Sequence, residues 1–421
     1  MSETVRRLDI SRILESGDTV VVGVLAQNTQ GVFFQYDAGY YPRFGNLSPL
    51  KLHADNRLQK APREPHERLH GVFSDALPDG WGRLLMDRYI RRIGGDPFAL
   101  TAMDRLAMLG DSGIGALRFH PSVPIELAEQ APDLSALGMA AQMLFEGRSD
   151  ALLSALMQVG SSGGARPKAL VYSDDPTLQR IRLSPAPGDQ AWIVKFTTGR
   201  TALGHNEGIA EALYLTLAEK AGCQPCAWTL VDAPPESGAT QWLAVKRFDV
   251  TKAGGRLHML SACGLLDSDY RTPSLDYVDL IKASRFLCQS PAVAKLQCRR
   301  ALFNLLALNH DDHTKNWAFL QRDHGGWEPA PWFDVTYSPH PFGEHAMSYR
   351  GFGSHPSKEA LMALAEAASM TRVELETVMH AIVEVLMTLP QEASALGLPS
   401  EVSDLMATRV KEQCGACLAA L

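Results

Sequence analysis

Apolar and polar positions alternate near the start of the chain, whereas the second half shows helical spacing. Residues 19–46 alternate in this way, with Gly and Asn at the expected turns, which predicts a small antiparallel sheet. Beyond residue 275, apolar residues recur every three or four positions, and prolines separate the segments. The segments predicted to be helical are 84–93, 103–109, 206–221, 277–288, 292–308, 358–368, 372–389 and 401–418.

The stretch from about residue 152 to 250 mixes predicted strands with one helix. One strand, Ala191–Phe196, carries Lys195 within an apolar run. Burying a lysine is costly unless it meets an anion, so this strand predicts an anion nearby. An edge strand with an outward-facing lysine is the alternative. The helix that follows offers Glu207 or Glu211 as a partner for the lysine, and the sequence alone does not choose between them.

A glycine-rich segment precedes that strand. Residues 159–168 are Val-Gly-Ser-Ser-Gly-Gly-Ala-Arg-Pro-Lys, followed by the apolar run 169–172. Small residues let backbone N–H groups approach phosphate oxygens closely, and Arg166 or Lys168 could add positive charge. An ordinary hairpin turn is the alternative for this segment. Downstream, the strand Leu243–Asp249 is suited to hydrogen-bond adenine through its backbone.

The polar segment 309–316, Asn-His-Asp-Asp-His-Thr-Lys-Asn, is the most informative motif of the chain. Phosphoryl transfer needs an aspartate near the acceptor hydroxyl and oxygen ligands for magnesium. Protein kinases place these on one loop as Asp-x-x-x-x-Asn, with a second aspartate beyond it. Asp311 and Asn316 have that spacing, and two apolar segments then predict a hairpin that returns Asp334 to the same loop. A polar, solvated loop is the alternative, because Asp, His and Asn are common in turns.

Composition bears on the number of subdomains and on whether the protein binds nucleic acid or membranes. The 421 residues are 46% hydrophobic, enough to bury large cores, and two or three subdomains are expected. A formal net charge of −7 argues against a generally basic nucleic-acid binder, although Arg299 and Arg300 could contact DNA within a complex. No apolar segment is long enough to span a membrane, and residues 1–4 open no signal peptide, so a cytoplasmic protein without membrane contact is expected.

Seven cysteines, an odd number, do not suggest a disulfide framework in a chain of this length. Cys223 and Cys226, and again Cys414 and Cys417, have the Cys-x-x-Cys spacing of a zinc-ribbon element. The two pairs lie much farther apart than in such elements, so we expect them to be small buried hydrophobic residues. The segment Gly110–Gly113 resembles the nucleophile loop of serine proteases, but its helical flanks favour a tight glycine turn.

Together these segments resemble the HipA toxin kinases of bacterial type II toxin–antitoxin modules, over nearly the whole chain. Phe73–Arg83 and Leu109–Leu117 are similar to signatures of the family's N-terminal subdomain. The Ser-x-Gly-Gly-Ala-x-x-Lys loop, the Val-x-Arg-Phe-Asp hinge and the Asp-x-His-x-x-Asn loop match the family in order and spacing. The last motif alone also occurs in small-molecule phosphotransferases and lipid kinases.

The resemblance implies the α+β class: a bilobal protein-kinase-like fold with an added N-terminal subdomain and a mainly helical C-terminal lobe. The expected divisions are a HipA-type N-terminal subdomain at 1–122, a kinase N-lobe with the glycine-rich loop and hinge at 123–250, and a helical C-lobe with the catalytic loop at 251–421. ATP and Mg²⁺ are the implied cofactors.

Carried over residue by residue, the resemblance makes Asp311 the catalytic aspartate and makes Asn316 and Asp334 the magnesium ligands. It also implies autophosphorylation of Ser161, at the start of the glycine-rich loop, which would expel the loop and silence the enzyme. The residues implied for ATP binding are Gly163, Gly164, Ala165, Arg166, Pro167, Lys168, Lys195, Lys246, Arg247, Phe248, His313, Thr314, Lys315, Asn316, Phe333 and Asp334.

Two positions depart from the family pattern. Asp312 stands where members often have glycine, and an extra carboxylate there could attract a metal or perturb Asp311 by like-charge repulsion. The spacing favours Asp311 as the catalytic residue, so an Asp312→Gly variant is expected to keep substantial activity. Lys246 replaces an acidic residue that is common at the hinge, which matters little if the backbone contacts adenine.

The implied activity is that of an ATP- and Mg²⁺-dependent, non-specific serine/threonine protein kinase. As a toxin it would phosphorylate a translation enzyme such as an aminoacyl-tRNA synthetase. A HipB-like helix-turn-helix antitoxin would neutralise it, and DNA would be contacted only through that complex. Two alternatives remain: a small-molecule phosphotransferase, and a catalytically idle antitoxin partner or co-repressor. The intact set of Lys195, Asp311, Asn316 and Asp334 disfavours the idle protein.

Overall fold

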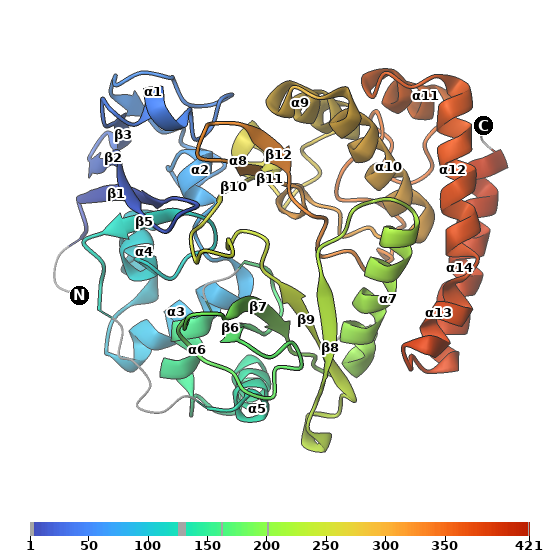
Figure 1. Cartoon of the computed structure of the whole chain (residues 1–421), viewed down its shortest axis with the longest axis horizontal. Helices are drawn as coiled ribbons and strands as arrows, with labels where there is room; N and C mark the ends of the chain where they lie inside the picture. Colours follow the sequence, from blue (N-terminus) through green and yellow to red (C-terminus); the bar gives the residue numbers. More distant parts are fainter. Residues whose placement is uncertain (1–3, 125–131, 161–162, 200–201, 420) are drawn as a thin grey trace.

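Three antiparallel sheets and a large group of C-terminal helices make up the fold, which confirms the expected α+β class and kinase-like architecture. The computed structural model describes residues 4–124, 132–160, 163–199, 202–419 and 421. The N-terminal sheet and the C-terminal helices lie at opposite ends of the molecule, with the other two sheets between them (Figure 1).

The N-terminal sheet contains five strands. They are Arg7–Ile13 (β1), Thr19–Asn28 (β2), Gly31–Tyr36 (β3), Gln59–Lys60 (β4) and Leu117–His120 (β5), in the order β4-β3-β2-β1-β5. Gly23 is required in β2, because a Cβ there would lie 2.1 Å from the carbonyl oxygen of Gln35. The predicted sheet is confirmed for β2 and β3. However, Tyr41–Phe44 form the short helix α1 instead of a strand, with Pro42 in its first turn.

Helices between β3 and the second sheet include two that the apolar spacing predicts. The set is Gly71–Ser74 (α2), Gly80–Arg92 (α3), Ala102–Leu109 (α4), Leu134–Phe145 (α5) and Leu153–Val159 (α6), with a 3-10 turn at Pro97–Ala99. α3 and α4 confirm the predicted helices in this part of the chain. Thr101 starts α4 through a capping box with Asp104, which satisfies donors at the helix end.

The second sheet carries the predicted lysine strand. Its elements are Lys168–Ser173 (β6), Gln190–Lys195 (β7), Trp228–Asp232 (β8) and Gln241–Lys246 (β9), in the order β6-β7-β9-β8, with the helix Glu207–Lys220 (α7) and 3-10 turns at Gly204–Asn206 and Pro235–Ser237. Helix α7 packs against β8 and β9. The pairing of β6 with β7 sets Lys168 directly opposite Lys195.

The C-terminal lobe is mainly helical, as predicted, and contains the third sheet. Its elements are His258–Ser261 (β10), Ala262–Leu266 (α8), Tyr277–Cys288 (α9), Pro291–Ala307 (α10), a 3-10 turn at Thr314–Asn316, Ala318–Gln321 (β11), Trp327–Pro329 (β12), Lys358–Ala367 (α11), Arg372–Leu386 (α12), Leu389–Ala395 (α13) and Ser400–Ala419 (α14). The hairpin of β11 and β12 precedes Asp334, in agreement with the prediction. The predicted helix 372–389 is shorter, because Pro390 stands in the first turn of a separate helix, α13.

Buried polar contacts join the N-terminal sheet to the C-terminal lobe. Arg12 of β1 is fully buried, and its guanidinium donates to Gln321 of β11, at 2.9 Å to the side-chain oxygen and 3.1 Å to the backbone carbonyl. The same group pairs with Asp323 at 3.2 Å. The N-terminal sheet is therefore an integral part of the packed structure.

The hinge after β9 is also tied to N-terminal residues. The carboxylate of Asp249 accepts a hydrogen bond from the Gly115 N–H at 2.8 Å and pairs with the buried Arg247 at 2.6 Å. Slightly further along, the Thr251 hydroxyl donates to the carbonyl of Glu15 at 2.8 Å. The segment that joins the two lobes thus has a fixed environment.

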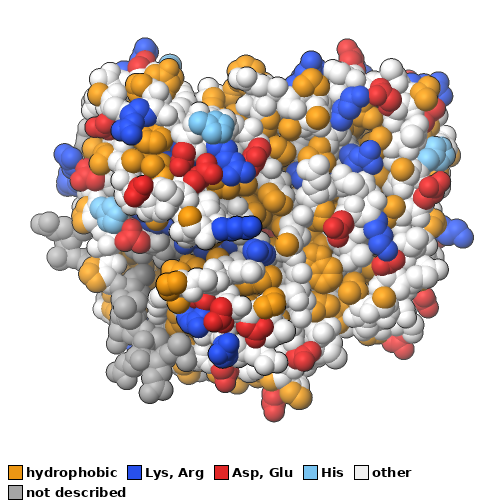
Figure 2. Space-filling model, in the orientation of Figure 1, with side chains coloured by type: hydrophobic (Ala, Val, Ile, Leu, Met, Phe, Trp, Pro, Cys, Tyr) orange, Lys and Arg blue, Asp and Glu red, His pale blue; other side chains and the backbone are white. Residues whose placement is uncertain are grey.

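The surface carries charges of both signs. Figure 2 shows acidic and basic side chains interspersed over one face of the molecule. On this face the charge is mixed, unlike the basic field typical of a nucleic-acid-binding surface. Within the described ranges, no helix is both long enough and apolar enough to cross a membrane.

Candidate active site

Two lysines project from neighbouring strands of the second sheet. Lys168 in β6 and Lys195 in β7 stand opposite each other, and both are largely buried. Like charges in this position repel each other, so the pair requires anionic neighbours. The carboxylate of Glu211 lies 2.6 Å from Lys195 Nζ, and that of Asp334 binds the same ammonium. The lysines and carboxylates form one cluster between the sheet, α7 and the C-terminal lobe.

The structure identifies which glutamate of α7 pairs with the strand lysine. Glu211 contacts Lys195, whereas Glu207, one turn earlier, pairs with Arg166 of the glycine-rich loop. Burial lowers the pKa of Arg166, and the nearby carboxylates of Asp311 and Glu211 act in the opposite direction. Arg166 therefore lies close to the catalytic loop as well as to α7.

Electrostatic effects within the cluster are large. Burial alone would lower the pKa of Lys195, but the carboxylates of Asp334 and Glu211 outweigh it and raise that pKa. Burial would likewise raise the pKa of Asp334, yet Lys195 and Lys168 hold it well below its ordinary value. Burial raises the pKa of Glu211 and lowers that of Lys168. Charges concentrated in a water-poor space interact strongly with a bound anion.

The predicted catalytic loop places Asp311 and Asn316 together. The side chain of Asp311 is 63% exposed, whereas Asn316 is buried. The Nδ2 of Asn316 donates to the Asp311 carbonyl at 2.7 Å, and the Asp311 N–H donates to the Ser338 hydroxyl at 3.2 Å. These bonds hold the backbone on both sides of Asp311, so its carboxylate is presented to solvent from a fixed position.

Asp312 has a structural role, so replacing it with glycine is expected to affect stability, while the expectation that Asp312→Gly keeps substantial activity stays a prediction. Its side chain is fully buried. It accepts hydrogen bonds from the Tyr277 hydroxyl (2.5 Å), the Nδ1 of His345 (2.8 Å) and the N–H groups of Ala346 (2.8 Å) and Met347 (3.3 Å). The carboxylate is used within the protein, so Asp312 anchors the catalytic loop instead of offering a metal ligand.

The residue before Asp334, Phe333, makes a contact between the two lobes. The ring of Phe333 lies 5.6 Å from that of Phe248 at the hinge. Asp334 itself has a left-handed backbone with φ of +54°, a conformation that Asp adopts more readily than most residues. This turn directs the Asp334 carboxylate to Lys195.

Some backbone N–H groups of the hinge already make hydrogen bonds within the protein. The N–H groups of Lys246 and Arg247 donate to the carbonyls of Ala227 and Ala191, at 2.8 and 2.9 Å. The Phe248 N–H makes no hydrogen bond with the described residues. In the segment predicted to bind adenine, the backbone of Phe248 is therefore the best candidate for that contact.

Two further residues of the predicted nucleotide site, His313 and Lys315, lie beside the ring of Tyr270. Lys315 Nζ lies 4.5 Å from the centre of the Tyr270 ring and pairs with Asp79 at 2.7 Å. The His313 ring lies 5.8 Å from the same tyrosine, and Thr314 is buried. In this structure the Lys315 ammonium is thus bound to a residue of the N-terminal part of the chain.

The glycine-rich loop is described from Gly163 onward, and Ser161 lies outside the described residues. Gly164 has φ of +94°, which glycine adopts at little cost. The ammonium of Lys168 donates back to the Gly163 carbonyl at 2.7 Å, and the carboxylate of Asp79 accepts from the Gly164 N–H. The loop is therefore closed over Lys168.

Asp79 is a site residue that the sequence analysis did not identify. The segment Phe73–Arg83 stands out only by its resemblance to a family signature. Its contact with Gly164 joins residues 85 positions apart, and no local spacing predicts such a contact.

The oxygen donors of the site suit Mg²⁺. Among the described residues, no three His, Cys, Asp or Glu side chains are grouped so as to hold a metal by themselves. Mg²⁺ does not need such a cage, since one or two protein oxygens, substrate phosphates and water complete its shell. The hydrogen bond from its Nδ2 leaves Asn316 with its Oδ1 as an acceptor, and Asp334 adds a carboxylate, so these two residues fit the ion.

Two other motifs are structural. The cysteines of both Cys-x-x-Cys pairs are buried, and burial raises the pKa of all four thiols to about 12, as expected for apolar residues. Gly110 ends α4 with φ of +49°, which confirms the glycine turn predicted there.

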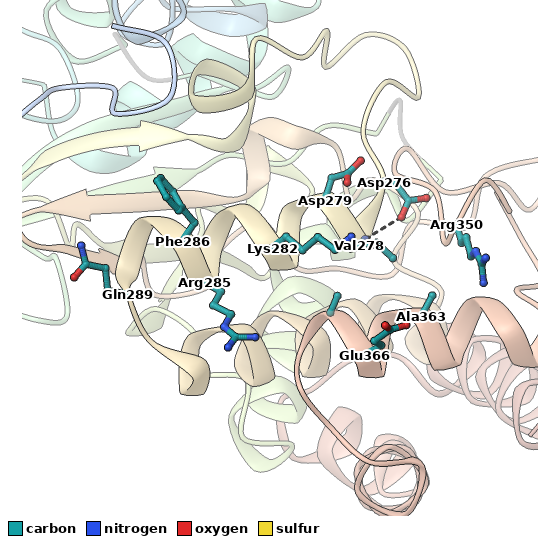
Figure 3. Close-up of a pocket in the computed structure, with 11 residues that line it drawn as sticks. Asp276, Val278, Asp279, Lys282, Arg285, Phe286, Gln289, Arg350, Ala363 and Glu366 are labelled. Atoms are coloured by element: carbon teal, nitrogen blue, oxygen red, sulfur yellow. Dashed lines mark hydrogen bonds between the residues drawn. The ribbon is translucent and has the colours of Figure 1, made fainter. Parts of the chain in front are cut away.

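A large hollow lies away from these residues. It has a volume of about 970 Å³ and lies beside α9 and α11, where Arg285 and Glu366 face the space between the two helices (Figure 3). None of the predicted nucleotide-binding residues lines it. The candidate active site, formed by the lysine cluster and the predicted catalytic loop, therefore lies apart from this hollow.

Comparison with known proteins covers both halves of the chain. The family described as the HipA-like C-terminal domain matches residues 160–392, and the HipA N-terminal domain matches residues 17–120. HipA of Shewanella oneidensis MR-1, solved with HipB and operator DNA, is 19% identical with a TM-score of 0.68, covering 97% of this chain and 96% of that chain. The Helicobacter pylori proinflammatory kinase CtkA is 15% identical with a TM-score of 0.35, covering 59% of this chain and 93% of that chain. No protein with a curated description matches.

The likeness to Shewanella HipA extends over almost the full length of both chains and shows a common fold. The match to the C-terminal domain family spans more than half of the sequence and contains the lysine strand, the catalytic loop and Asp334. The chain belongs to the HipA family.

Proposed function

We propose that the protein is an ATP- and Mg²⁺-dependent serine/threonine protein kinase. The observation that carries this proposal is the buried cluster of Lys168, Lys195, Glu211 and Asp334 beside a loop that presents the exposed Asp311. Two buried lysines that already need anionic partners are suited to bind phosphate oxygens. An exposed carboxylate nearby is suited to meet an acceptor hydroxyl.

In the proposed reaction, Asp311 accepts the proton of the acceptor hydroxyl. The hydroxyl oxygen bonds to the terminal phosphorus of ATP while the bond from that phosphorus to ADP breaks. Lys168 and Lys195 orient the phosphates, and the Phe248 backbone holds the adenine. Asn316 and Asp334 hold Mg²⁺, which when bound neutralises charge on the phosphates.

The biological setting is proposed from the family. Shewanella HipA was solved as part of a toxin–antitoxin system with HipB and operator DNA. We propose that this chain is likewise a cytoplasmic toxin, that a HipB-like helix-turn-helix protein neutralises it, and that it meets DNA only through that complex. A translation enzyme such as an aminoacyl-tRNA synthetase is the proposed substrate.

Incubation with labelled ATP and a cell extract tests the activity. A labelled protein band supports the kinase, a labelled metabolite would indicate a small-molecule phosphotransferase, and no label would indicate an idle antitoxin partner. Asp311→Asn should abolish transfer with ATP affinity nearly intact, while Asp334→Asn should weaken binding of Mg·ATP. Equal loss of nucleotide binding in both variants would contradict these two roles.

Autophosphorylation of Ser161 is part of the proposal. A phosphoserine adds about −1.5 to −2 charges at neutral pH at the mouth of the glycine-rich loop, where it would repel ATP phosphates and compete for the same N–H groups. Active protein should carry phosphate on Ser161, Asp311→Asn protein should carry none, and Ser161→Asp should bind ATP poorly. Mass spectrometry that finds Ser162 modified instead, or neither serine in an active kinase, would refute this regulation.

A further inference from the structure

One carboxylate from the N-terminal part of the chain contacts both loops of the candidate active site. Asp79 Oδ1 accepts from the Gly164 N–H, and Oδ2 accepts from Lys315 Nζ at 2.7 Å. Asp79 occupies the N-cap position of α3, yet its side chain makes no capping hydrogen bond there. With 15% of its side chain exposed, the carboxylate is committed to the two loops instead of to its own helix.

The backbone that follows this aspartate is shaped for the same contact. Gly80 approaches the glycine-rich loop so closely that a Cβ would lie 2.6 Å from both Ala165 Cα and the Gly164 carbonyl oxygen. The next residue, Trp81, donates its N–H to the Gly164 carbonyl at 2.9 Å and its ring N–H to the Lys168 carbonyl at 2.8 Å. Both backbone polar groups of Gly164 are therefore held by this N-terminal segment.

The second contact reaches the catalytic loop. Lys315 lies between Asp311 and Asn316 in the chain, and most of its side chain is buried against the Tyr270 ring. The Lys315 ammonium lies 2.7 Å from the Asp79 carboxylate, so the two side chains form an ion pair.

We propose that Asp79 is a positioning residue that latches the glycine-rich loop to the catalytic loop. By holding Gly164 and Lys315 through one carboxylate, it fixes the loop that would cover the phosphates relative to the loop that would deprotonate the acceptor. Catalysis by positioning is sensitive to shifts of about 1 Å. This role rests on the proposed function, whereas the mechanical link between the two loops does not.

Hydrogen–deuterium exchange of the full-length protein, without nucleotide, tests the link. Asp79→Ala should speed exchange in residues 163–168 by about 10-fold or more, the effect expected when a hydrogen bond to a charged group is lost. Asp79→Asn keeps an oxygen acceptor and should restore most of the protection. Glu67→Gln, which removes a more exposed carboxylate from the same region, should leave exchange unchanged.

Lys315→Met breaks only the second contact. It should speed exchange in residues 311–316 and leave residues 163–168 protected, because Asp79 still accepts from Gly164. This variant also serves if Asp79→Ala does not fold. Unchanged exchange in both loops, in whichever variants fold, would overturn the latch.

The KM for ATP shows whether Asp79 positions the glycine-rich loop or competes with ATP phosphate for the Gly164 N–H. A latch predicts that Asp79→Ala raises the KM for ATP by about 10-fold, with a partial return in Asp79→Asn. A lower KM would mean that the carboxylate competes with phosphate for the Gly164 N–H, and would overturn the proposal. If the protein transfers no phosphate, the exchange results still decide the link; if it is an active kinase with unaltered exchange, only the latch fails.

Discussion

Replacing Asp312 with glycine should destabilise the whole protein, whereas changing the adjacent Asp311 should not. Four donors converge on the buried Asp312 carboxylate: the Tyr277 hydroxyl, the His345 ring and two backbone N–H groups. Glycine would leave all four without this acceptor in a site closed to solvent. Asp311→Asn, by contrast, alters an exposed side chain and leaves the backbone contacts of the loop in place.

The expected loss of stability follows from these contacts. A buried donor that loses its partner costs about 1–3 kcal/mol, so four donors give at least about 4 kcal/mol if nothing moves. Relaxation and entry of water reduce this figure, while the greater freedom of glycine in the unfolded chain adds about 0.5–1 kcal/mol. We therefore expect Asp312→Gly to lower the free energy of unfolding by about 3–5 kcal/mol and Asp311→Asn to change it by less than about 0.5 kcal/mol.

Urea unfolding followed by tryptophan fluorescence measures this difference. Trp317, one of seven tryptophans that together follow unfolding of the protein, lies beside the mutated position, because its ring N–H donates to the Asp312 carbonyl at 3.1 Å. Asp312→Asn, which keeps the shape and one oxygen acceptor, should fall between wild type and Asp312→Gly. A loss below about 1 kcal/mol for Asp312→Gly would refute the reasoning. If Asp312→Gly is inactive but as stable as the wild type, Asp312 takes part in the reaction and does not only hold the loop in place.

Two further predictions concern the two glutamates of α7 and the effect of pH on stability through His258. Glu211→Gln should raise the KM for ATP by about 10-fold, because the largely buried Lys195 loses a charged partner, whereas Glu207→Gln should change it less, because its partner Arg166 is exposed; equal effects would contradict the assignment. Burial, aided by Arg12, lowers the pKa of His258 to about 3, so below pH 6.5 the unfolded chain binds a proton that the folded chain does not. Lowering the pH from 6.5 to 5 should therefore cost about 2 kcal/mol of stability from this residue, and urea unfolding of His258→Gln should show a smaller pH dependence.

Short-range spacing predicted much of the candidate site. Asp311 and Asn316 lie on one loop because only a few residues separate them, and an apolar strand pattern identified Lys195. The choice between Glu207 and Glu211 could not be predicted. Both lie on α7 one turn apart, and the direction of each depends on how the helix packs against the sheet.

Long-range contacts account for what the sequence did not predict. Asp79 meets Lys315, 236 positions further along the chain, only because the N-terminal segment packs beside both loops. The role of Asp312 is hidden for the same reason, since its partner Tyr277 lies 35 positions earlier and its partner His345 lies 33 positions later. An aspartate in a polar motif has the same sequence pattern whether its side chain is buried or exposed.

The ties at the hinge have a consequence for the release of nucleotide. Enzymes with two lobes commonly admit and discharge ligands by bending at the joint between them. Here that joint is held by the hydrogen bonds of Asp249 with Gly115 and of Thr251 with Glu15. These bonds tie the joint to the N-terminal part of the chain, so bending there must either move that part as well or break a buried charge-assisted contact. If the protein uses ATP as proposed, release of ADP therefore requires that either these hinge contacts or the contact of Asp79 with Gly164 break.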